Sequence, residues 1–333
     1  MTIFNQDVIH RLPALQLYEP NKPDKLNEPN EPNKLNKPNK PNEPNEPNKP
    51  NKGSISNFQV SKVIRNNGRR LGVCVLASGS RGNAIWVGDD RTQILFDAGL
   101  SGIEIQRRCR SKSLDPALLH AIIVSHEHAD HIQSVGVLSR RFHLPIYISK
   151  KTEETAGHLL GKVPDIRHFA CGTPFSVNTL DVSPFSIPHD AEDPAGFTIS
   201  TNGMKIGIAT DLGVATAMVK ERLKACHVLV LEANHDPEML IKGPYPWPLK
   251  QRIQGRTGHL SNADSRQLLS DLKHEGLQHV VLAHLSETNN TPEKARGEVG
   301  QALSGSHTQL HVASQSMCAE IIVVEGRIQD VQN

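Results

Sequence analysis

The sequence predicts an α/β protein built from two mixed β-sheets with helices on their outer faces. Short apolar runs rich in β-branched residues alternate with segments whose apolar residues recur every three or four positions. These are the periods of strands and of helices. Some strand runs follow one another across a turn and others are separated by a helix, so the sheets should be mixed. Two sheets that pack on each other and carry helices outside are the natural layering.

The N-terminal part of the chain has a different composition. Residues 20–52 are almost entirely Asn, Pro, Lys and Glu, in triplets such as NEP and NKP. Such a segment has too few apolar residues to offset the entropy lost on ordering, and regularly spaced prolines favour extended stretches. We therefore predict a disordered, low-complexity tail over residues 1–70 and one folded domain over residues 71–329.

Nine apolar runs predict the strands of this domain, and four amphipathic stretches predict its helices. The strand runs cover residues 71–77, 84–88, 93–97, 121–125, 180–187, 196–201, 204–210, 227–233 and 279–284. The helical stretches cover residues 131–142, 152–160, 214–225 and 260–275. Ser261 near the start of the last stretch is a typical helix-start residue.

Five of the strand runs deliver a side chain that can bind a metal at or just beyond their last residue. These side chains are the histidines that follow residues 121–125, then His189, Asp211, His235 and His284. Loops at the ends of a rigid sheet commonly assemble a site in this way.

The charge is divided unevenly along the chain. Residues 1–70 contain 12 basic and 7 acidic residues, a net of +5, whereas the whole chain carries 37 − 35 = +2. Residues 71–333 therefore sum to −3, which argues against a broad basic surface for nucleic acid. Bound metal ions or a local basic patch would have to attract phosphate.

The cysteines and the apolar runs bear on the location of the protein. The chain has five scattered cysteines and no CxxC pair, which is typical of a reducing cytoplasm rather than of a disulfide framework. We see neither a signal peptide nor an apolar run that could cross a membrane. The expectation is a cytoplasmic protein.

The segment HEHADH, residues 126–131, is the strongest functional signal. His126 and His128 are two residues apart, so on an extended segment they point to the same side and can share one ion. Asp130 and His131 follow as the chain turns into a helix, and can serve a second ion. Imidazoles with a few carboxylates suit zinc, with manganese as the alternative. The competing interpretation is a histidine-rich surface loop.

Six motifs in this order resemble the metallo-β-lactamase superfamily. They are FDAG (96–99), SHEHADH (125–131), PHD (188–190), ATDLG (209–213), GHLSN (258–262) and AHLS (283–286). The resemblance spans nearly all of residues 71–326. ASGSRGN (77–83), HDAEDPAGF (189–197) and the stretch 231–262 resemble its YycJ/WalJ-like branch, whose members are regarded as phosphodiesterases or exonucleases acting on DNA. The resemblance implies a four-layer αββα sandwich with a two-metal site at one edge.

The resemblance also implies a ligand set for two divalent ions. One ion would be held by His126, His128 and His189, the other by Asp130, His131 and His284, and Asp211 would bridge them. True β-lactamases usually carry a cysteine at the position of Asp211. The aspartate here points away from antibiotic hydrolysis and towards a bimetallic hydrolase.

His259 has three open interpretations, namely a further ligand, a catalytic group or a histidine that merely starts a helix. Phosphodiesterases of the superfamily, tRNase Z among them, place a non-ligand histidine at a similar point before the last ligand, which here is His284. The resemblance implies that His259 binds a phosphate oxygen or protonates the leaving group, and a histidine can do either near neutral pH.

Two acidic residues join His259 as catalytic candidates. These are Asp130 and Asp97. Asp97 is expected to hydrogen-bond a metal-binding histidine from behind, and the alternative is that it stabilises its own turn. We interpret Glu127, His235 and Asp236 as supporting or structural residues.

Substrate contacts are expected from a basic, aromatic stretch and from a Gly/Ser turn. Residues 242–256 combine four basic side chains with Tyr245 and Trp247, which suits a strand with phosphates and stackable bases. An ordinary surface loop explains them equally well. The turn at 78–83 could bind a phosphate oxygen through its N–H groups. The substrate-binding candidates are Ser80, Asn83, Lys250, Arg252 and Ser286.

The predicted function is a metal-dependent nuclease, with nucleic acid as its partner. We expect a 5′-to-3′ exonuclease on DNA rather than RNA, in which a hydroxide bridging two zinc ions attacks phosphorus. The alternatives are a small-molecule hydrolase, either a cyclic-phosphate esterase or a glyoxalase-type thioesterase, and a non-catalytic metal-binding protein.

Overall fold

The computed structural model describes residues 70–325. Apart from Arg70, the predicted disordered tail lies outside the described residues, and so does the predicted end of the domain at residue 329. Every candidate site residue falls within the described range. No helix in this range is long and apolar enough to cross a membrane.

The described strands form two seven-stranded sheets. The first contains β1 (Arg70–Ala77), β2 (Ala84–Gly88), β3 (Gln93–Phe96), β4 (Ala121–Ile123), β5 (Ile146–Ser149), β6 (Ile166–Phe169) and β14 (Ile322–Glu325). The second contains β7 (Phe175–Val177), β8 (Leu180–Ser186), β9 (Ala195–Thr201), β10 (Met204–Ala209), β11 (Val228–Glu232), β12 (His279–Ala283) and β13 (Gln309–Val312). The orders are β14-β1-β2-β3-β4-β5-β6 and β13-β12-β11-β10-β9-β8-β7.

Each sheet is half antiparallel and half parallel. Strands β14 to β3 pair antiparallel and β3 to β6 pair parallel. In the second sheet β7 to β10 are antiparallel and β10 to β13 are parallel. The prediction of mixed sheets is therefore confirmed.

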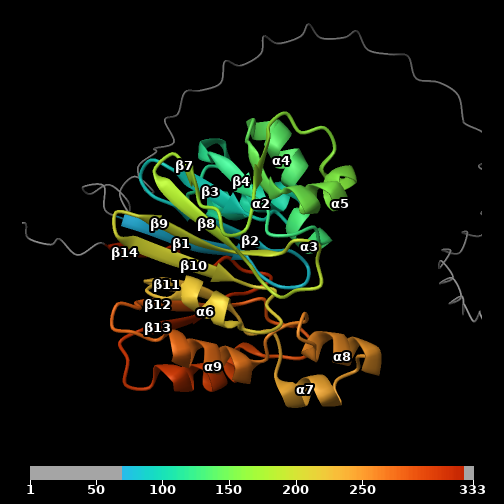
Figure 1. The fold of residues 1–333 in the computed structure, drawn as a ribbon, viewed down its shortest axis with the longest axis vertical. Helices are drawn as coiled ribbons and strands as arrows, with labels where there is room; N and C mark the ends of the chain where they lie inside the picture. Colours follow the sequence, from blue (N-terminus) through green and yellow to red (C-terminus); the bar gives the residue numbers. More distant parts are fainter. Residues whose placement is uncertain (1–69, 326–333) are drawn as a thin grey trace, which may run out of the picture. The chain divides into compact units, whose positions relative to one another are not determined.

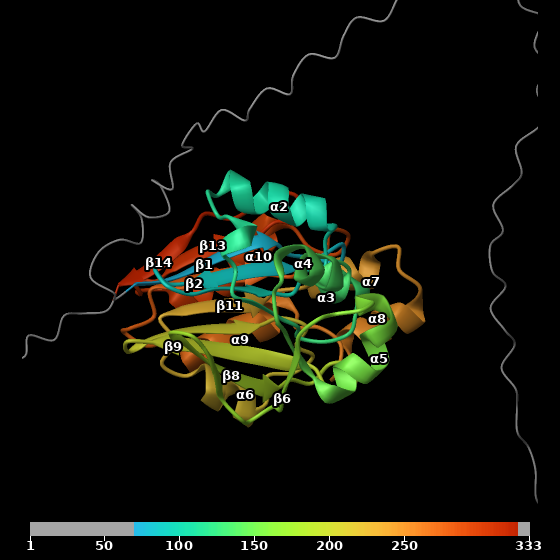
Figure 2. The same cartoon turned by 90° about the horizontal axis from the view of Figure 1, so that it is seen from above.

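Helices cover the outer face of both sheets. The described helices are α2 (Gly102–Ser111), α3 (Ala129–Ile132), α4 (Val135–Phe142), α5 (Lys150–Leu160), α6 (Ala217–Leu223), α7 (Pro237–Lys242), α8 (Trp247–Gln254), α9 (Asn262–Leu272) and α10 (Pro292–Val299), with short 3₁₀ helices η1 (Pro116–Leu118) and η2 (Gly300–Leu303). Figure 2 shows α2 outside one sheet and α6 outside the other, with the strands between them.

Three apolar cores hold these layers together. The central core lies between the sheets, where the rings of Phe96 and Phe197 are 5.2 Å apart. A second core packs α2, α4 and α5 on the first sheet around Trp86. A third packs α6, α9 and α10 on the second sheet. Helix, sheet, sheet and helix confirm the predicted four-layer sandwich.

The structure differs from the predicted elements at short or polar segments. All nine predicted strands are present, and the structure has five further strands of three or four residues each that the sequence did not predict, namely β5, β6, β7, β13 and β14. Strand β6 has the mixed pattern IRHF and exists through its pairing with β5. The helix predicted over 131–142 breaks at Ser134, whose N–H and hydroxyl both donate to the carbonyl of Ala98.

The carboxyl ends of several strands meet at one edge of the sandwich. Figures 1 and 2 both place α3, α7 and α8 at this edge, away from β14. Asp97, Asp211 and His284 lie just beyond β3, β10 and β12 and have φ of 58°, 57° and 55°. Left-handed backbone is uncommon for residues other than glycine and is found where a site constrains the chain. Here it turns the chain sharply as each strand ends.

Candidate metal centre

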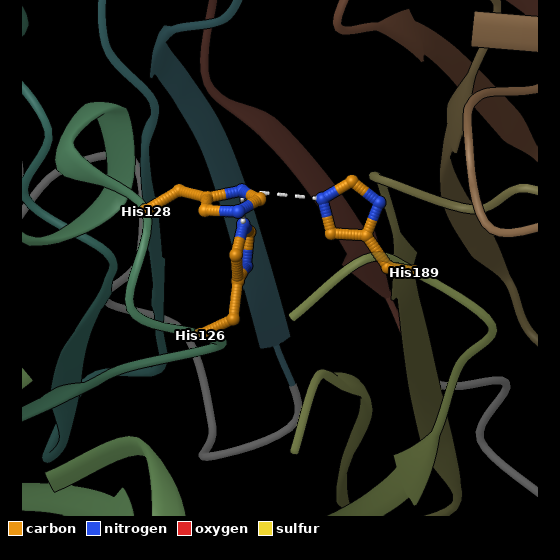
Figure 3. Close-up of side chains that lie close together, drawn as sticks. All are labelled: His126, His128 and His189. Atoms are coloured by element: carbon orange, nitrogen blue, oxygen red, sulfur yellow. Dashed lines mark hydrogen bonds between the residues drawn. The ribbon is translucent and has the colours of Figure 1, made fainter. Parts of the chain in front are cut away.

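Three histidines converge at the first half of the centre. His126 and His128 come from the segment after β4 and His189 from the loop after β8, and Figure 3 shows their rings facing one another. His128 Nδ1 lies 3.1 Å from His126 Nε2 and 3.3 Å from His189 Nε2. Two nitrogens on one tetrahedral zinc, with bonds near 2.0–2.1 Å, are about 3.3 Å apart. The spacing therefore fits one shared ion.

The protonation state of His126 also suits a ligand. Its side chain is fully buried. Burial, followed by the charges of neighbouring histidines, lowers the pKa of His126 well below its ordinary value. A neutral imidazole is the form that binds a metal.

A carboxylate and two histidines form the second half of the centre. Asp130 Oδ2 lies 3.5 Å from His131 Nε2 and 3.8 Å from His284 Nε2. Asp130 and His131 belong to α3, whereas His284 follows β12. One oxygen and two nitrogens thus surround a second position.

Asp211 lies between the two halves. Its Oδ1 is 3.9 Å from His189 Nε2 and its Oδ2 is 3.3 Å from His131 Nε2. Both Asp211 Oδ2 and His284 Nε2 are buried without a hydrogen-bond partner. Buried polar atoms are normally paired, so such orphans need an explanation. Two divalent cations would supply the missing partners, and the residues present fit them.

Hydrogen bonds from behind orient the candidate ligands. His131 Nδ1 donates to Asp97 Oδ2 at 2.8 Å, and His284 Nδ1 donates to Glu232 Oε1 at 2.9 Å. Each bond places the hydrogen on Nδ1 and leaves Nε2 without one, as in many metal sites. His284 Nε2 has no hydrogen-bond partner, whereas His131 Nε2 lies 3.0 Å from Asn83 Nδ2. Gly99 permits the close packing here, because a Cβ at this position would overlap the carbonyl oxygen of Asp130.

Glu232 is the site residue that the sequence interpretation missed. It ends β11, is fully buried, and accepts hydrogen bonds from His259 Nδ1 at 2.8 Å and from His284. Its other oxygen accepts from the backbone N–H groups of Leu212 and Leu260. The available signal was an acid at the end of an apolar strand, whereas the sequence pattern singled out His235, three residues after the end of β11.

The charges of Glu232 and His259 shift the pKa values of the two groups in opposite directions. Burial raises the pKa of Glu232, yet the charge of His259 and the two histidine hydrogen bonds outweigh it and hold the pKa below its ordinary value. Burial lowers the pKa of His259, but the charge of Glu232 outweighs it and the pKa is raised. His259 therefore holds a proton more readily than an ordinary histidine does.

The turn at residues 78–83 braces the centre. The N–H groups of Gly79 and Arg81 donate to Asn83 Oδ1 and Gln315 Oε1, so they already have protein partners. Asn83 Nδ2 lies 3.2 Å from Asp130 Oδ2. Ser80 is exposed, and contact of Ser80 and Asn83 with substrate stays a prediction.

The remaining substrate-binding candidates have different surroundings. Arg252 is exposed and its Nε donates to Asp190 Oδ2, next to His189. Lys250 is buried and donates to the carbonyls of Ile241 and Gly243, so the structure gives it a bracing contact. Ser286 is buried and its hydroxyl accepts from a backbone N–H. Their contact with substrate also stays a prediction.

His235 and Asp236 lie outside the converging ligand atoms. His235 is buried and its Nδ1 has no partner. Asp236 caps α7 by accepting from the N–H of Met239. Neither side chain belongs to a group of described residues that could hold a metal ion.

We expect Glu232→Gln to weaken both the fold and the metal centre. Each oxygen of Glu232 accepts two hydrogen bonds, and glutamine replaces one of these oxygens with an NH₂ group, which cannot accept them. In either orientation of the amide, two buried donors therefore lose their acceptor, and each unpaired buried group costs about 1–3 kcal/mol. For a domain of this size, 1 kcal/mol lowers the melting temperature by about 2–4 °C. Loss of the bond to His284 should weaken metal binding by about 10- to 100-fold.

Calorimetry and metal titration check this expectation. Glu287→Gln is the matched control, because Glu287 is exposed and forms a surface ion pair with Arg81 that contributes about 0–1 kcal/mol. Equal melting temperatures and equal metal affinities in the two variants would contradict the role given to Glu232.

Comparison with known proteins identifies the family. A model of the β-lactamase superfamily domain matches residues 92–285. The chain is 38% identical over 231 residues to a Bacillus anthracis protein named exodeoxyribonuclease YycJ, covering 69% of this chain and 88% of that protein. It is 34% identical over 225 residues to a Streptococcus pneumoniae (strain D39) protein named exodeoxyribonuclease WalJ, covering 66% and 84%.

A solved structure shows the same fold. The metallo-β-lactamase fold protein YhfI from Bacillus subtilis aligns with a TM-score of 0.59 at 17% identity, over 75% of this chain and 99% of that chain. The matching family, the sandwich and the histidine and aspartate clusters agree with one another. The chain belongs to the metallo-β-lactamase superfamily, in which it resembles the YycJ and WalJ proteins, and it is a metal-dependent hydrolase.

Proposed function

We propose that this chain is a nuclease that hydrolyses phosphodiester bonds, and more specifically a 5′-to-3′ exonuclease on DNA rather than RNA. The observation that carries the proposal is His259, a histidine backed by Glu232 beside the candidate ligands. Its ring lies 5.2 Å from that of His284 and 5.3 Å from that of His189, measured between centroids. The two relatives named exodeoxyribonucleases support DNA as substrate.

The protein side chains divide the work of hydrolysis. His259 holds a proton on the ring nitrogen that faces away from Glu232, and donates it to the departing oxygen. Glu232 keeps the ring oriented and favours its protonated form. Asp97 and Glu232 hold the imidazoles of His131 and His284 in the orientation that the ligand role requires. Asp130 serves both as a metal ligand and as a catalytic carboxylate, in the half of the centre that also contains His131 and His284.

The donor set favours zinc, with manganese as the alternative. Five imidazoles and two carboxylates form the proposed ligand set, and imidazole-rich sites suit zinc. When bound, two such ions lower the pKa of water to near 7 and offset the charge of a phosphodiester. In this proposal His126, His128 and His189 hold one ion, Asp130, His131 and His284 hold the other, and Asp211 bridges them. The free state of all five cysteines agrees with the proposed cytoplasmic location.

A substrate panel tests the function. The purified full chain, with its metal content measured, is offered duplex DNA, single-stranded DNA, RNA, cyclic nucleotides and glutathione thioesters. We expect 5′-labelled DNA to release labelled mononucleotide at once and 3′-labelled DNA to shorten progressively. Asp211→Ala purified in parallel is the control for contaminating nuclease. Turnover of thioesters alone would show a small-molecule hydrolase and would end the nuclease proposal.

A further inference from the structure

The α7–α8 hairpin, residues 237–255, stands at the edge of the sandwich that carries the metal centre (Figures 1 and 2). The sequence leaves nucleic-acid contact and an ordinary surface loop open for residues 242–256, and the structure forms helix α8 within this stretch. Resting on the proposed nuclease function, we propose that Trp247, the first residue of α8, is a stacking platform for a base of an unpaired DNA strand whose phosphate lies at the centre.

Trp247 is unusually exposed for its type. It is 58% exposed, whereas Trp86, the other tryptophan of the chain, is fully buried in the core. Ile241 on the same hairpin is 55% exposed. Large exposed apolar side chains can mark a binding surface. An indole ring with free faces can stack on any base.

The hairpin is braced from within, so Trp247 is held in place before any ligand arrives. Lys250 Nζ donates to the carbonyls of Ile241 and Gly243 at 2.7 and 2.8 Å and ties α8 to α7. Prolines at 244, 246 and 248 restrict the backbone on either side of Trp247. A platform that is already ordered loses little entropy on binding.

Helix α8 leads directly into the catalytic residues. The carbonyl of Ile253 accepts from the backbone N–H of His259 at 2.9 Å. Arg252 reaches Asp190, whose Oδ1 lies 3.4 Å from His189 Nε2. Trp247 begins the helix, roughly 8 Å along the axis from Arg252. A strand leaving the metal centre along α8 therefore meets Arg252 before Trp247.

Local charge favours a nucleic acid over other occupants. Residues 237–258 contain four basic side chains and one acidic side chain, within a domain region that sums to −3. Three of the four, Lys242, Arg252 and Arg256, are exposed. A positive segment with an aromatic ring complements phosphates and bases of a single strand. Paired bases are stacked within a duplex, so the platform needs an unpaired strand.

Binding of a single-stranded oligonucleotide with phosphorothioate linkages tests the platform in the metal-loaded full chain. Because Trp86 is buried, quenching of tryptophan fluorescence reports on Trp247. We expect strong quenching in the wild type and none in Trp247→Phe. Trp247→Ala should raise the dissociation constant by roughly 5- to 160-fold, and Trp247→Phe should recover most of the affinity because it keeps a ring.

The matched control is Leu118→Ala. Leu118 is 52% exposed and lies in η1 before β4, at the opposite end of that strand from the centre, so its removal should leave the dissociation constant unchanged. Steady-state kinetics give a second measurement, in which Trp247→Ala raises KM for single-stranded DNA much more than it lowers kcat. A merely structural role would lower kcat and melting temperature instead and would overturn the proposal.

The outcomes separate the platform from the nuclease function. If the wild type degrades DNA and Trp247→Ala binds the oligonucleotide as tightly as the wild type, the platform is wrong and the function stands. If the wild type degrades no nucleic acid, the function is wrong, and an absence of quenching would then remove the platform as well. Quenching by lipid vesicles or by a protein in place of DNA would overturn the assignment of the occupant.

Discussion

His284→Ala is expected to lose about one divalent ion per chain and essentially all turnover. His284 Nε2 is buried, has no hydrogen-bond partner, and lies 3.8 Å from Asp130 Oδ2. Alanine leaves Asp130 and His131 as the remaining ligands on that side, and two ligands plus a bridge hold a divalent ion weakly. Without that ion, the site loses half of the positive charge that offsets the phosphodiester.

Metal analysis by mass spectrometry and DNA hydrolysis measure the two effects. The matched control is His279→Ala, because His279 begins the same strand that His284 follows and is half-buried at its far end. It should retain both ions and wild-type turnover. A His284→Ala protein that kept two ions would show that the ligand set is wrong.

His259→Ala is expected to keep both ions and to lose turnover by about 10²- to 10⁴-fold, the usual contribution of a positioned acid or base. The reason is that His259 donates to Glu232 through Nδ1 and stands on the exposed side of the centre, with a 21% exposed side chain. Its removal leaves the candidate ligands and their supporting hydrogen bonds in place, apart from one bond to Glu232.

Metal content and kcat on labelled DNA, measured on one preparation, check this expectation. Imidazole added to His259→Ala should restore part of the lost rate, because it can enter the half-open space and donate a proton. A substrate with a leaving group that needs no proton should be much less affected by the change. A drop in metal content would reveal His259 as a ligand rather than an acid.

His259 and His284 show why two histidines near one carboxylate take different proposed roles. Both donate to the same oxygen of Glu232. His284 follows β12 directly in a left-handed conformation and points its Nε2 into the buried interior, whereas His259 precedes α9 and stays partly exposed. His284 is buried because it follows a strand of the sheet, and this burial suits a metal ligand. His259 is partly exposed because it precedes a helix, and this exposure suits an acid that must reach the substrate.

Most of the fold could be predicted because its strands carry their signal locally. Runs such as residues 228–232 and 279–283 are buried along nearly their whole length, and continuous apolar runs of this kind mark strands buried on both faces. Short edge or half-exposed strands such as β6 and β13 escaped prediction, since hydrogen bonds to a neighbouring strand define them and no local pattern does. The same holds for the break at Ser134, which depends on the carbonyl of Ala98.

The sequence by itself determined the kind of chemistry in this protein. His126, His128, Asp130 and His131 lie within six residues, and their alternation on an extended segment followed by a helical turn already divides them between two positions. The tertiary structure alone decided what supports them. Glu232 acquires its role because β11 ends between His259 and His284, and Lys250 braces a hairpin because burial turns its ammonium towards two carbonyls. A buried charge is stable only when nearby groups pair with it or hydrogen-bond to it. Those groups come from distant parts of the chain, so the local sequence does not reveal them.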